Sequence, residues 1–286
     1  TMDKNNVNKE KSRLKESPKI YSAYATYLTK YIEAYKKEGV EIDRICVQNE
    51  PDTYAPFPGC NMTMNQFEDL SLNYIIPAFE KKKLNTGIWA GTFRTINRGD
   101  HYKILNTETI NKFDGIGFQY ANEPFIREVS LLAPNMKIIN TETKCYNGDN
   151  STNQAKERIS EIANYINAGS TNYCYWNMIL NETSKSAWGW KQNSLVVINR
   201  ENGDIQYTPD YNAMYITSNT IIKGDKRIAH ISKHSIVTTK NSDNEIKVLI
   251  QNDKLSNQFV RLIINENEIN VELPKDALCG LTIRLK

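Results

Sequence analysis

Residues 44–51 read Arg44-Ile45-Cys46-Val47-Gln48-Asn49-Glu50-Pro51, a short apolar run that ends in an amide, a carboxylate and a proline. The spacing of the apolar residues predicts a buried strand, and residues 52–58 are typical of a loop. Glu50 is therefore expected at the carboxyl end of a strand, the edge where parallel α/β folds bind ligands and carry out chemistry. Neighbouring residues of a regular strand point to opposite faces, so Asn49 and Glu50 share a site only if the strand twists at its end. The alternative is a strand that simply ends in a solvated polar loop.

The composition is that of an ordinary globular protein, with 40% hydrophobic and 24% charged residues among 286. The 36 basic and 33 acidic residues give a formal charge of +3, which does not favour a nucleic-acid or membrane-surface partner. No apolar run is long enough to span a membrane, and the polar first 16 residues are not a signal peptide. The 16 tyrosines and 4 tryptophans offer faces for sugar rings, although most aromatic side chains are core residues.

No metal site and no cofactor is expected. The three histidines, His101, His230 and His234, lack metal-ligand spacing, and the five cysteines contain no C-x-x-C pair. No glycine motif for a nucleotide is present. A disulfide between Cys60 and Cys145 stays open, because both residues follow predicted site strands.

Up to about residue 222 the chain alternates short apolar runs with amphipathic stretches. Strands are predicted to start near residues 43, 87, 114, 137 and 172. Helices are predicted between them, over residues 17–38, 63–77 or beyond (with a capping box at Thr63 and a kink at Pro77), 100–105, 124–132, 153–167 and 209–222. Short extended segments are expected at 194–198 and 205–208. This βα repeat predicts a parallel sheet or barrel.

From about residue 224, short alternating apolar runs are separated by turns rich in Asn, Asp and Gly. This pattern predicts a small antiparallel β module. We therefore expect three parts: a loop or disordered lead-in (1–16), a partial (β/α) barrel that carries the catalytic site (17–222), and an antiparallel β-sandwich module (223–286).

A second short apolar run, over residues 137–142, also ends in a carboxylate, that of Glu142. Strand ends converge on one mouth of a barrel, so Glu50 and Glu142 are expected to face each other there. Two carboxylates are the minimum equipment of a glycosidase: one donates a proton to the leaving oxygen, and the other attacks the anomeric carbon or activates a water. The alternative is that these strands end in polar residues without forming a site.

The same edge collects amides and aromatic rings that suit sugar hydroxyls and sugar faces. They are Gln119, Tyr120, Trp176 and Asn177, with Trp188 and Trp190 in the loop that follows. We interpret them, together with Asn49, as substrate-binding residues of a site that needs no metal.

Several motifs, in this order, resemble glycoside hydrolase family 30. They are Val47-Gln48-Asn49-Glu50-Pro51, then Cys60-x-Met62-Thr63, Gly115-x-Gly117-Phe118-Gln119-Tyr120, Thr141-Glu142-Thr143-x-Cys145, Tyr175-Trp176-Asn177-Met178, Trp188-Gly189-Trp190-x-Gln192-Asn193-Ser194 and residues 223–228. The resemblance covers most of residues 17–286.

The resemblance implies a retaining mechanism, with Glu50 as the general acid/base and Glu142 as the nucleophile. Asn49 matches the residue that contacts the sugar 2-hydroxyl, Gln119 a polar residue of the cleft, and Trp176 an aromatic wall. Trp188 and Trp190 match the rim of the cleft. The two carboxyl groups of a retaining enzyme stand about 5–5.5 Å apart. The charge of the nucleophile is expected to raise the pKa of the acid/base.

A family member closes its α/β fold with eight βα units, whereas this chain matches about five of them, the fourth to the eighth, and the β module. We therefore expect an incomplete (β/α)8-barrel of glycosidase type, from the C-terminal part of a longer protein, with the N-terminal part as a partner.

Two hypotheses follow. The first is a retaining hydrolase that cleaves β-glucosidic bonds in a glucosylceramide-like glycolipid or a β-1,6-glucan-like oligosaccharide, outside the cell or at its surface. The second is a truncated, catalytically silent carbohydrate-binding or interaction fragment of such an enzyme.

Overall fold

The computed structural model describes residues 13–53, 59–94, 107–120, 123–143, 147–187 and 189–284. The chain forms two compact units. The first comprises Thr1–Thr143 and Ala168–Cys174, and the second comprises Lys144–Asn167 and Tyr175–Lys286. The division into parts 1–16, 17–222 and 223–286 stays a prediction.

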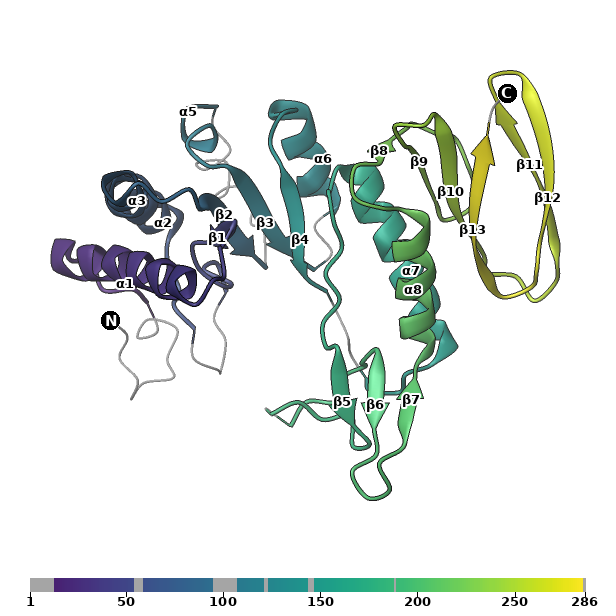
Figure 1. The fold of residues 1–286 in the computed structure, drawn as a ribbon, viewed down its shortest axis with the longest axis horizontal. Coiled ribbons are helices and arrows are strands. Elements are labelled where there is room, and N and C mark those ends of the chain that lie inside the picture. The colour runs from purple at the N-terminus through teal and green to yellow at the C-terminus, as the bar shows by residue number, and fades with distance from the viewer. Residues whose placement is uncertain are drawn as a thin grey trace. The chain divides into compact units, whose positions relative to one another are not determined.

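Four parallel strands form the sheet of the first unit, in the order β1-β2-β3-β4 (Figure 1). They are β1 (Arg44–Cys46), β2 (Gly87–Phe93), β3 (Gly115–Gln119) and β4 (Ile138–Glu142). The predicted strand starts near residues 43, 87, 114 and 137 are thereby confirmed. Every residue of β3 and all but the first of β2 are buried, which is typical of strands in a parallel sheet.

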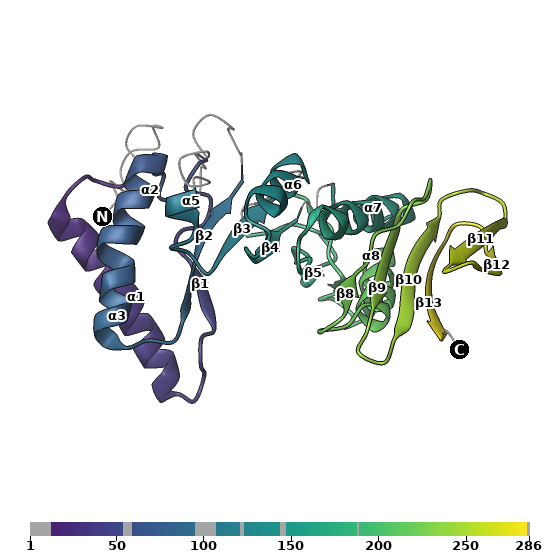
Figure 2. The ribbon, with the colours of Figure 1, turned by 90° about the horizontal axis from the view of Figure 1, so that it is seen from above.

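Helix α1 (Pro18–Lys37) lies beside a second helical stretch, on the same side of β1 and β2 (Figure 2). That stretch runs through α2 (Met64–Leu70), the π-helical turn η1 (Ser71–Ile75) and α3 (Ile76–Lys82). Its predicted capping box is confirmed, because the Thr63 hydroxyl accepts from the Gln66 N–H and the Gln66 side chain accepts from the Thr63 N–H.

The helix continues past Pro77, and its departure from α geometry is the π-helical turn just before that residue. The first unit also contains the short helix α5 (Thr107–Ile110) and helix α6 (Glu123–Leu132). The helix predicted over residues 100–105 lies outside the described residues.

Within the described parts of the βα series, the structure corrects the strand predicted to start near residue 172. The Thr171 N–H donates to the Ile138 carbonyl of β4, 2.8 Å away, but no ladder follows. Side-chain amides take the place of the ladder: the Asn140 N–H donates to Asn172 Oδ1 at 2.8 Å, and the Cys174 N–H donates to Asn140 Oδ1 at 2.9 Å. The segment is thus held against β4 without forming a strand, and the described sheet has four strands, not five.

Two helices and a small sheet form the first part of the second unit. The helices are α7 (Thr152–Ala168) and α8 (Pro209–Thr220). Strand β6 (Val196–Ile198) pairs in parallel with β5 (Ile179–Asn181) and antiparallel with β7 (Ile205–Tyr207), which confirms the predicted extended segments.

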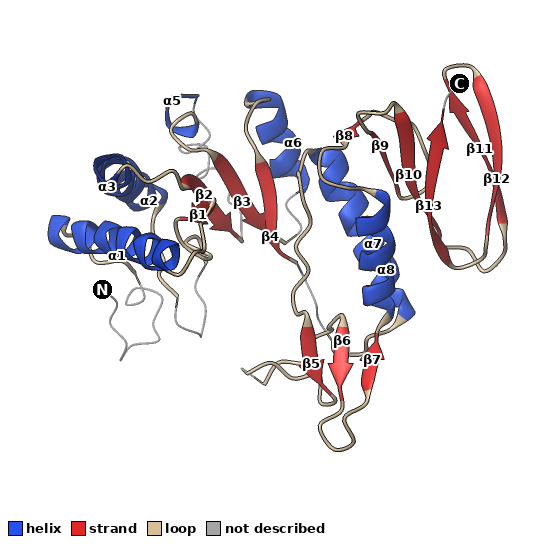
Figure 3. Ribbon diagram, viewed as in Figure 1, coloured by secondary structure: helices blue, strands red, loops and turns tan. Residues whose placement is uncertain are grey.

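The remaining strands pair antiparallel, as predicted (Figure 3). One sheet has the order β13-β10-β9-β8 and the other is the hairpin β11-β12. Their bounds are β8 (Lys226–Arg227), β9 (Ile236–Lys240), β10 (Glu245–Asn252), β11 (Gln258–Ile264), β12 (Asn267–Leu273) and β13 (Ala277–Arg284).

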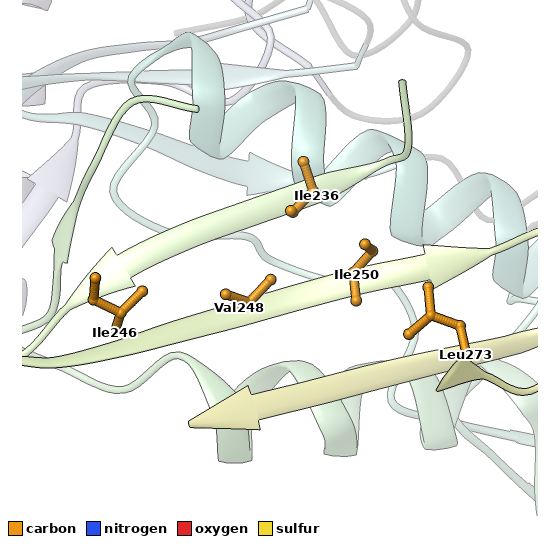
Figure 4. Packing of buried hydrophobic residues seen from close by; sticks show 5 residues of the cluster. All are labelled: Ile236, Ile246, Val248, Ile250 and Leu273. Carbon is orange, nitrogen blue, oxygen red and sulfur yellow. The ribbon is translucent and has the colours of Figure 1, made fainter. Parts of the chain in front are cut away.

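Strand β10 is the centre of this module because both of its faces are buried. Ile246, Val248 and Ile250 point to one face, where they pack with Ile236 and Leu273 (Figure 4). On the other face, Leu249 of β10 and Val237 of β9 pack with Ala163 of α7. The alternation of a β-strand thus serves two apolar layers at once.

Candidate active site

Glu50 lies where the chain leaves the sheet of the first unit. Beyond β1 the chain stays paired with β2, through a 3.1 Å bond from the Gln48 N–H to the Gly91 carbonyl and a 2.9 Å bond from the Glu50 N–H to the Thr92 carbonyl. Glu50 then adopts a φ of +47°, a left-handed conformation that is uncommon for residues with a side chain. This turn of the backbone is the twist that lets Asn49 and Glu50 serve the same sheet edge.

Glu142 is the last residue of β4, and two side chains from the end of β3 bind its carboxylate. The Tyr120 hydroxyl donates to Glu142 Oε1 at 2.5 Å, and Gln119 Nε2 donates to Glu142 Oε2 at 3.3 Å. A register shift between Phe118 and Gln119 sets Gln119 directly opposite Glu142. The register shift at the end of β3 therefore brings Gln119 next to the Glu142 carboxylate.

Gln119 also links the nucleophile candidate to the Asn-Glu pair. Its Nε2 atom lies 2.7 Å from Asn49 Oδ1 and 3.0 Å from Thr92 Oγ1, and the Thr92 hydroxyl itself donates to Asn49 Oδ1 at 3.1 Å. Gln119 is 1% exposed. Because these donors occupy Asn49 Oδ1, the group of Asn49 that could contact a ligand is its NH₂ group, which donates.

A cation sits beside the Glu50 carboxylate, 4% of whose side chain is exposed. Arg94 Nε lies 3.6 Å from Glu50 Oε1, and the guanidinium lies over the Tyr120 ring at 5.1 Å from its centroid. The Arg94 backbone N–H donates to Asp52 Oδ1 at 3.0 Å. Glu50 Oε2 is buried and has no hydrogen-bond partner among the described residues.

Burial is the main cause of the raised pKa of both acids. It raises the pKa of Glu50 to about 7, with Arg94 opposing the shift and Glu142 adding to it. The expected rise is therefore present, but the charge of Glu142 is not its largest cause. Burial also raises the pKa of Glu142, and the Tyr120 hydrogen bond and the Arg94 charge oppose that rise.

Sequence reasoning brought Glu50, Glu142, Asn49, Gln119 and Tyr120 together, and the structure places all five at one end of the first unit's sheet. It missed Thr92 and Arg94. The signal was available, because both residues lie at the end of the strand predicted to start near residue 87, and the other predicted site residues also lie at or near strand ends. Thr92 and Arg94 differ from the predicted site residues in type, because those are carboxylates, amides and aromatic rings.

The other predicted substrate residues belong to the second unit. Trp176 and Trp190 are 45% and 43% exposed, and Asn177 Nδ2 donates to Gln192 Oε1 at 2.9 Å. Trp188 lies outside the described residues. The roles of these residues at the sugar site stay predictions.

Among the described residues, no cluster of three His, Cys, Asp or Glu side chains could hold a metal ion. Cys60 is a free thiol, and Cys145, its suggested disulfide partner, lies outside the described residues. None of the described helices has the length and apolar character needed to cross a membrane.

No family model matches the chain. Among curated proteins, the chain is 39% identical over 88 residues to endo-1,6-β-D-glucanase BGN16.3 of Trichoderma harzianum, which is 30% of this chain and 18% of that protein. It is 24% identical over 235 residues to putative glucosylceramidase 3 of Caenorhabditis elegans, which is 75% of this chain and 45% of that protein. The chain thus spans less than half the length of either relative.

Solved structures share the fold. SrfJ from Salmonella typhimurium matches 94% of this chain and 64% of its own, with a TM-score of 0.85 at 15% identity. The endo-β1,6-glucanase BT3312 matches 94% of this chain and 65% of its own, with a TM-score of 0.82 at 20% identity. A glycoside hydrolase family 30 subfamily 8 xylanase from Clostridium acetobutylicum matches 93% of this chain and 72% of its own, with a TM-score of 0.72 at 18% identity.

At these identities the structures establish an α/β fold of glycosidase type, with the parallel sheet as part of a barrel. The glucanase and glucosylceramidase relatives add similarity in sequence to this similarity in fold. The resemblance of this chain to glycoside hydrolase family 30, over part of the family's length, is thereby confirmed.

Proposed function

We propose that this chain carries the two catalytic carboxylates of a retaining β-glycosidase, with Glu142 as nucleophile and Glu50 as general acid/base. The observation that supports it most is the arrangement of the two acids. Both lie at the carboxyl end of one parallel sheet, they interact electrostatically, and the pKa of Glu50 is about 7. An acid with that pKa is protonated in a large fraction of molecules at neutral pH and can also act as a base.

In the first step, an oxygen of the ionised Glu142 attacks the anomeric carbon of the substrate. The bond from that carbon to the glycosidic oxygen breaks, and the leaving oxygen takes the proton of Glu50. The products of this step are a free alcohol, a glycosyl ester on Glu142 and an ionised Glu50.

In the second step, Glu50 takes a proton from water and the resulting hydroxide oxygen attacks the anomeric carbon. The ester bond to Glu142 breaks, so both carboxyl groups return to their starting states and the sugar keeps its anomeric configuration. The Tyr120 and Gln119 donors stabilise the Glu142 carboxylate before attack and after release.

The substrate class proposed is a β-glucosidic bond in a β-1,6-glucan or a glucosylceramide-like lipid, because the relatives carry names of both kinds. Asn49, with its NH₂ group oriented as a donor, is the proposed contact of a sugar hydroxyl. Trp176, Asn177, Trp188 and Trp190 are proposed to complete the sugar site. An extracellular or cell-surface location stays part of the proposal, as does the activity of the whole protein, since the chain spans less than half of these relatives.

A fluorinated glycoside with a good leaving group tests the nucleophile directly. Fluorine at C2 of 2,4-dinitrophenyl β-glucoside slows both steps, and the activated leaving group restores only the first, so the glycosyl ester accumulates. We expect one fluoroglucosyl adduct per chain, on the peptide containing Glu142, and one equivalent of released dinitrophenolate.

The Glu142→Gln variant should show no adduct, and the matched variant Glu157→Gln, at an exposed position of α7, should be labelled like the parent. An adduct on another carboxylate would show that the nucleophile is misassigned. Saccharide binding without any adduct would favour a catalytically silent carbohydrate-binding fragment.

A further inference from the structure

Arg94 is the first residue after β2, and its backbone ties two parts of the site together. Its N–H donates to Asp52 Oδ1 at 3.0 Å, so the end of β2 is bound to the loop that follows Glu50. A buried neighbour supports this geometry: Gly91 has a φ of +102°, and a Cβ there would stand 2.2 Å from the Gly117 carbonyl oxygen. The bend that directs the chain toward Arg94 therefore requires glycine.

The Arg94 side chain reaches toward both carboxylates of the site. Its Nε atom stands 3.6 Å from Glu50 Oε1. Its guanidinium covers the ring of Tyr120, whose hydroxyl donates to Glu142 Oε1. With 34% of its side chain exposed, Arg94 is partly withdrawn from water, which strengthens its field at the two acids.

The two oxygens of Glu50 are placed differently. Oε1 faces the Arg94 cation, and Oε2 is buried without a hydrogen-bond partner among the described residues. A carboxyl group arranged in this way is best protonated on Oε2, because a proton on Oε1 would face a positive charge. When the proton leaves, the new negative charge is stabilised at Oε1 by Arg94.

We propose that Arg94 is a positioning residue that holds Glu50 through Oε1 and stabilises the Glu50 carboxylate between the two proton transfers. This inference rests on the proposed glycosidase function. Arg94 need not touch the sugar: it acts through Glu50 on one side and through the Tyr120–Glu142 pair on the other.

The charges that face Glu50 come from three other parts of the described site. They are the Arg94 cation after β2, the Glu142 carboxylate at the end of β4 and the Asp52 carboxylate in the loop after Glu50. Glu142 in turn faces the Tyr120 hydroxyl, the Arg94 cation and the thiol of Cys174. Arg94 is the one cation in this described set, so its removal acts on both acids in the same direction.

Replacing Arg94 with Gln removes the positive charge but keeps a polar side chain. The pKa of Glu50 should rise by about one pH unit, and that of Glu142 should also rise. Hydrolysis requires a protonated Glu50 and an ionised Glu142, so both limbs of the kcat/KM profile should move to higher pH. Arg94→Lys keeps the charge and should move the profile much less.

The deciding measurement is a ¹³C-NMR titration of chains labelled at the Glu Cδ atoms, with the Glu50 signal assigned by its loss in Glu50→Gln. We expect the Glu50 midpoint to rise in Arg94→Gln and to stay close to that of the parent in Arg94→Lys. A midpoint that is the same in the parent and Arg94→Gln would overturn the proposal, and so would equal shifts in the Gln and Lys variants.

The titration separates this inference from the proposed function, because it needs no turnover. A chain with shifted midpoints but no fluoroglucosyl adduct would retain the electrostatic role of Arg94 and lose the glycosidase assignment. A chain that forms the adduct, but whose titration midpoints are the same with and without Arg94, would retain the glycosidase assignment and lose the electrostatic role of Arg94. If Arg94→Gln does not fold, Arg94→Met, which keeps the length of the side chain without its charge, serves in its place.

Discussion

Two of the described carboxylates that are withdrawn from water, those of Asp225 and Glu50, are hydrogen-bonded to different degrees. In the second unit, 2% of the Asp225 side chain is exposed and it pairs with Lys247 Nζ at 3.0 Å. Its Oδ2 atom also accepts from the Ile222 N–H at 3.1 Å and the Thr239 hydroxyl at 3.4 Å. In the first unit, Glu50 is as deeply buried, but its cation stands 3.6 Å away and Oε2 has no partner among the described residues.

This difference in hydrogen bonding separates a buried carboxylate with a structural role from one that can transfer a proton. Both oxygens of Asp225 are bound to donors, so this buried carboxylate is a structural contact that holds Lys247, Ile222 and Thr239 in place. Glu50 has an unbound oxygen and a pKa raised to about 7, so it can both give and take a proton near neutral pH, as a general acid/base requires. Carboxylate-to-amide substitutions at the two positions should therefore have unlike consequences.

The largest expected effect is on the rate of hydrolysis by Glu50→Gln. An amide cannot give up a proton to the leaving oxygen, so kcat/KM for an alkyl β-glucoside should fall by roughly 10²–10⁴-fold. With a dinitrophenyl leaving group, which needs little protonation, the loss should be far smaller. Rates measured across a series of leaving groups test this, with Asp225→Asn as the matched substitution.

If the loss in Glu50→Gln were the same for all leaving groups, Glu50 would not be the acid. Asp225→Asn, measured where it is folded, should retain the parent rate on every member of the series.

The second effect is on stability, in Asp225→Asn. The substitution leaves Lys247, 8% of whose side chain is exposed, as a buried cation without its counter-ion. Breaking one side of a buried pair in this way destabilises proteins by about 3–5 kcal/mol. A urea titration at pH 7 measures the change, with Glu157→Gln as a surface control expected within about 0.5 kcal/mol of the parent.

An Asp225→Asn variant as stable as the parent would mean that the charged pair contributes no more than an amide does. The difference between Asp225 and Glu50 would then lie only in the hydrogen bonds that their oxygens accept.

The third effect has the opposite sign, in Glu50→Gln. The folded pKa of about 7 lies above the ordinary value of 4.5, so between these pH values the unfolded chain releases a proton that the folded chain keeps. Stability contributed by Glu50 is therefore lost as pH rises from about 4.5 to about 7, by up to roughly 3 kcal/mol. Glu50→Gln should be more stable than the parent at pH 8 and similar to it at pH 5.

Urea titrations of both proteins at the two pH values provide the measurement. A variant that gains nothing at pH 8 would show that Glu50 is ionised without strain in the folded chain, and that its pKa is not raised.

Features of this fold that depend on neighbouring residues could be predicted from the sequence. Features that depend on contacts between distant residues could not. Runs such as the one ending in Glu50 are local, and β1 to β4 were all predicted from them. The capping box at Thr63 is equally local, since both of its bonds lie within three residues. The strand predicted to start near residue 172 is wrong because the Asn172 side chain, and not its backbone, accepts from the Asn140 N–H, 32 residues away.

The candidate site divides in the same way. Glu50 and Glu142 are identifiable because each carboxylate ends an apolar run, and the family resemblance gives each a proposed role. The geometry that brings Arg94 to the two acids has no sequence signal, because it depends on the bend at Gly91 and on the pairing of β2 with β3. The left-handed conformation of Glu50 likewise has no sequence signal, since such residues are usually glycine or asparagine.

The smallest expected effect extends the comparison to the surface. Lys82 Nζ pairs with Glu33 Oε1 at 3.0 Å, the same separation as the pair of Lys247 with Asp225, but 51% and 37% of these side chains are exposed. Water and salt screen such a pair, so Lys82→Met should change stability by less than about 1 kcal/mol. A double-mutant cycle with Glu33→Gln, run at low and high salt, isolates the coupling energy. A coupling that vanishes in salt would assign the difference between the two pairs to burial, because their distances are equal. A coupling energy that resists salt and equals that of the Lys247–Asp225 pair would instead mean that geometry, and not burial, sets the strength of both pairs. The contrast between Asp225 and Glu50 would then depend only on the 3.6 Å distance from Arg94 to Glu50 and on the unbound Oε2 of Glu50.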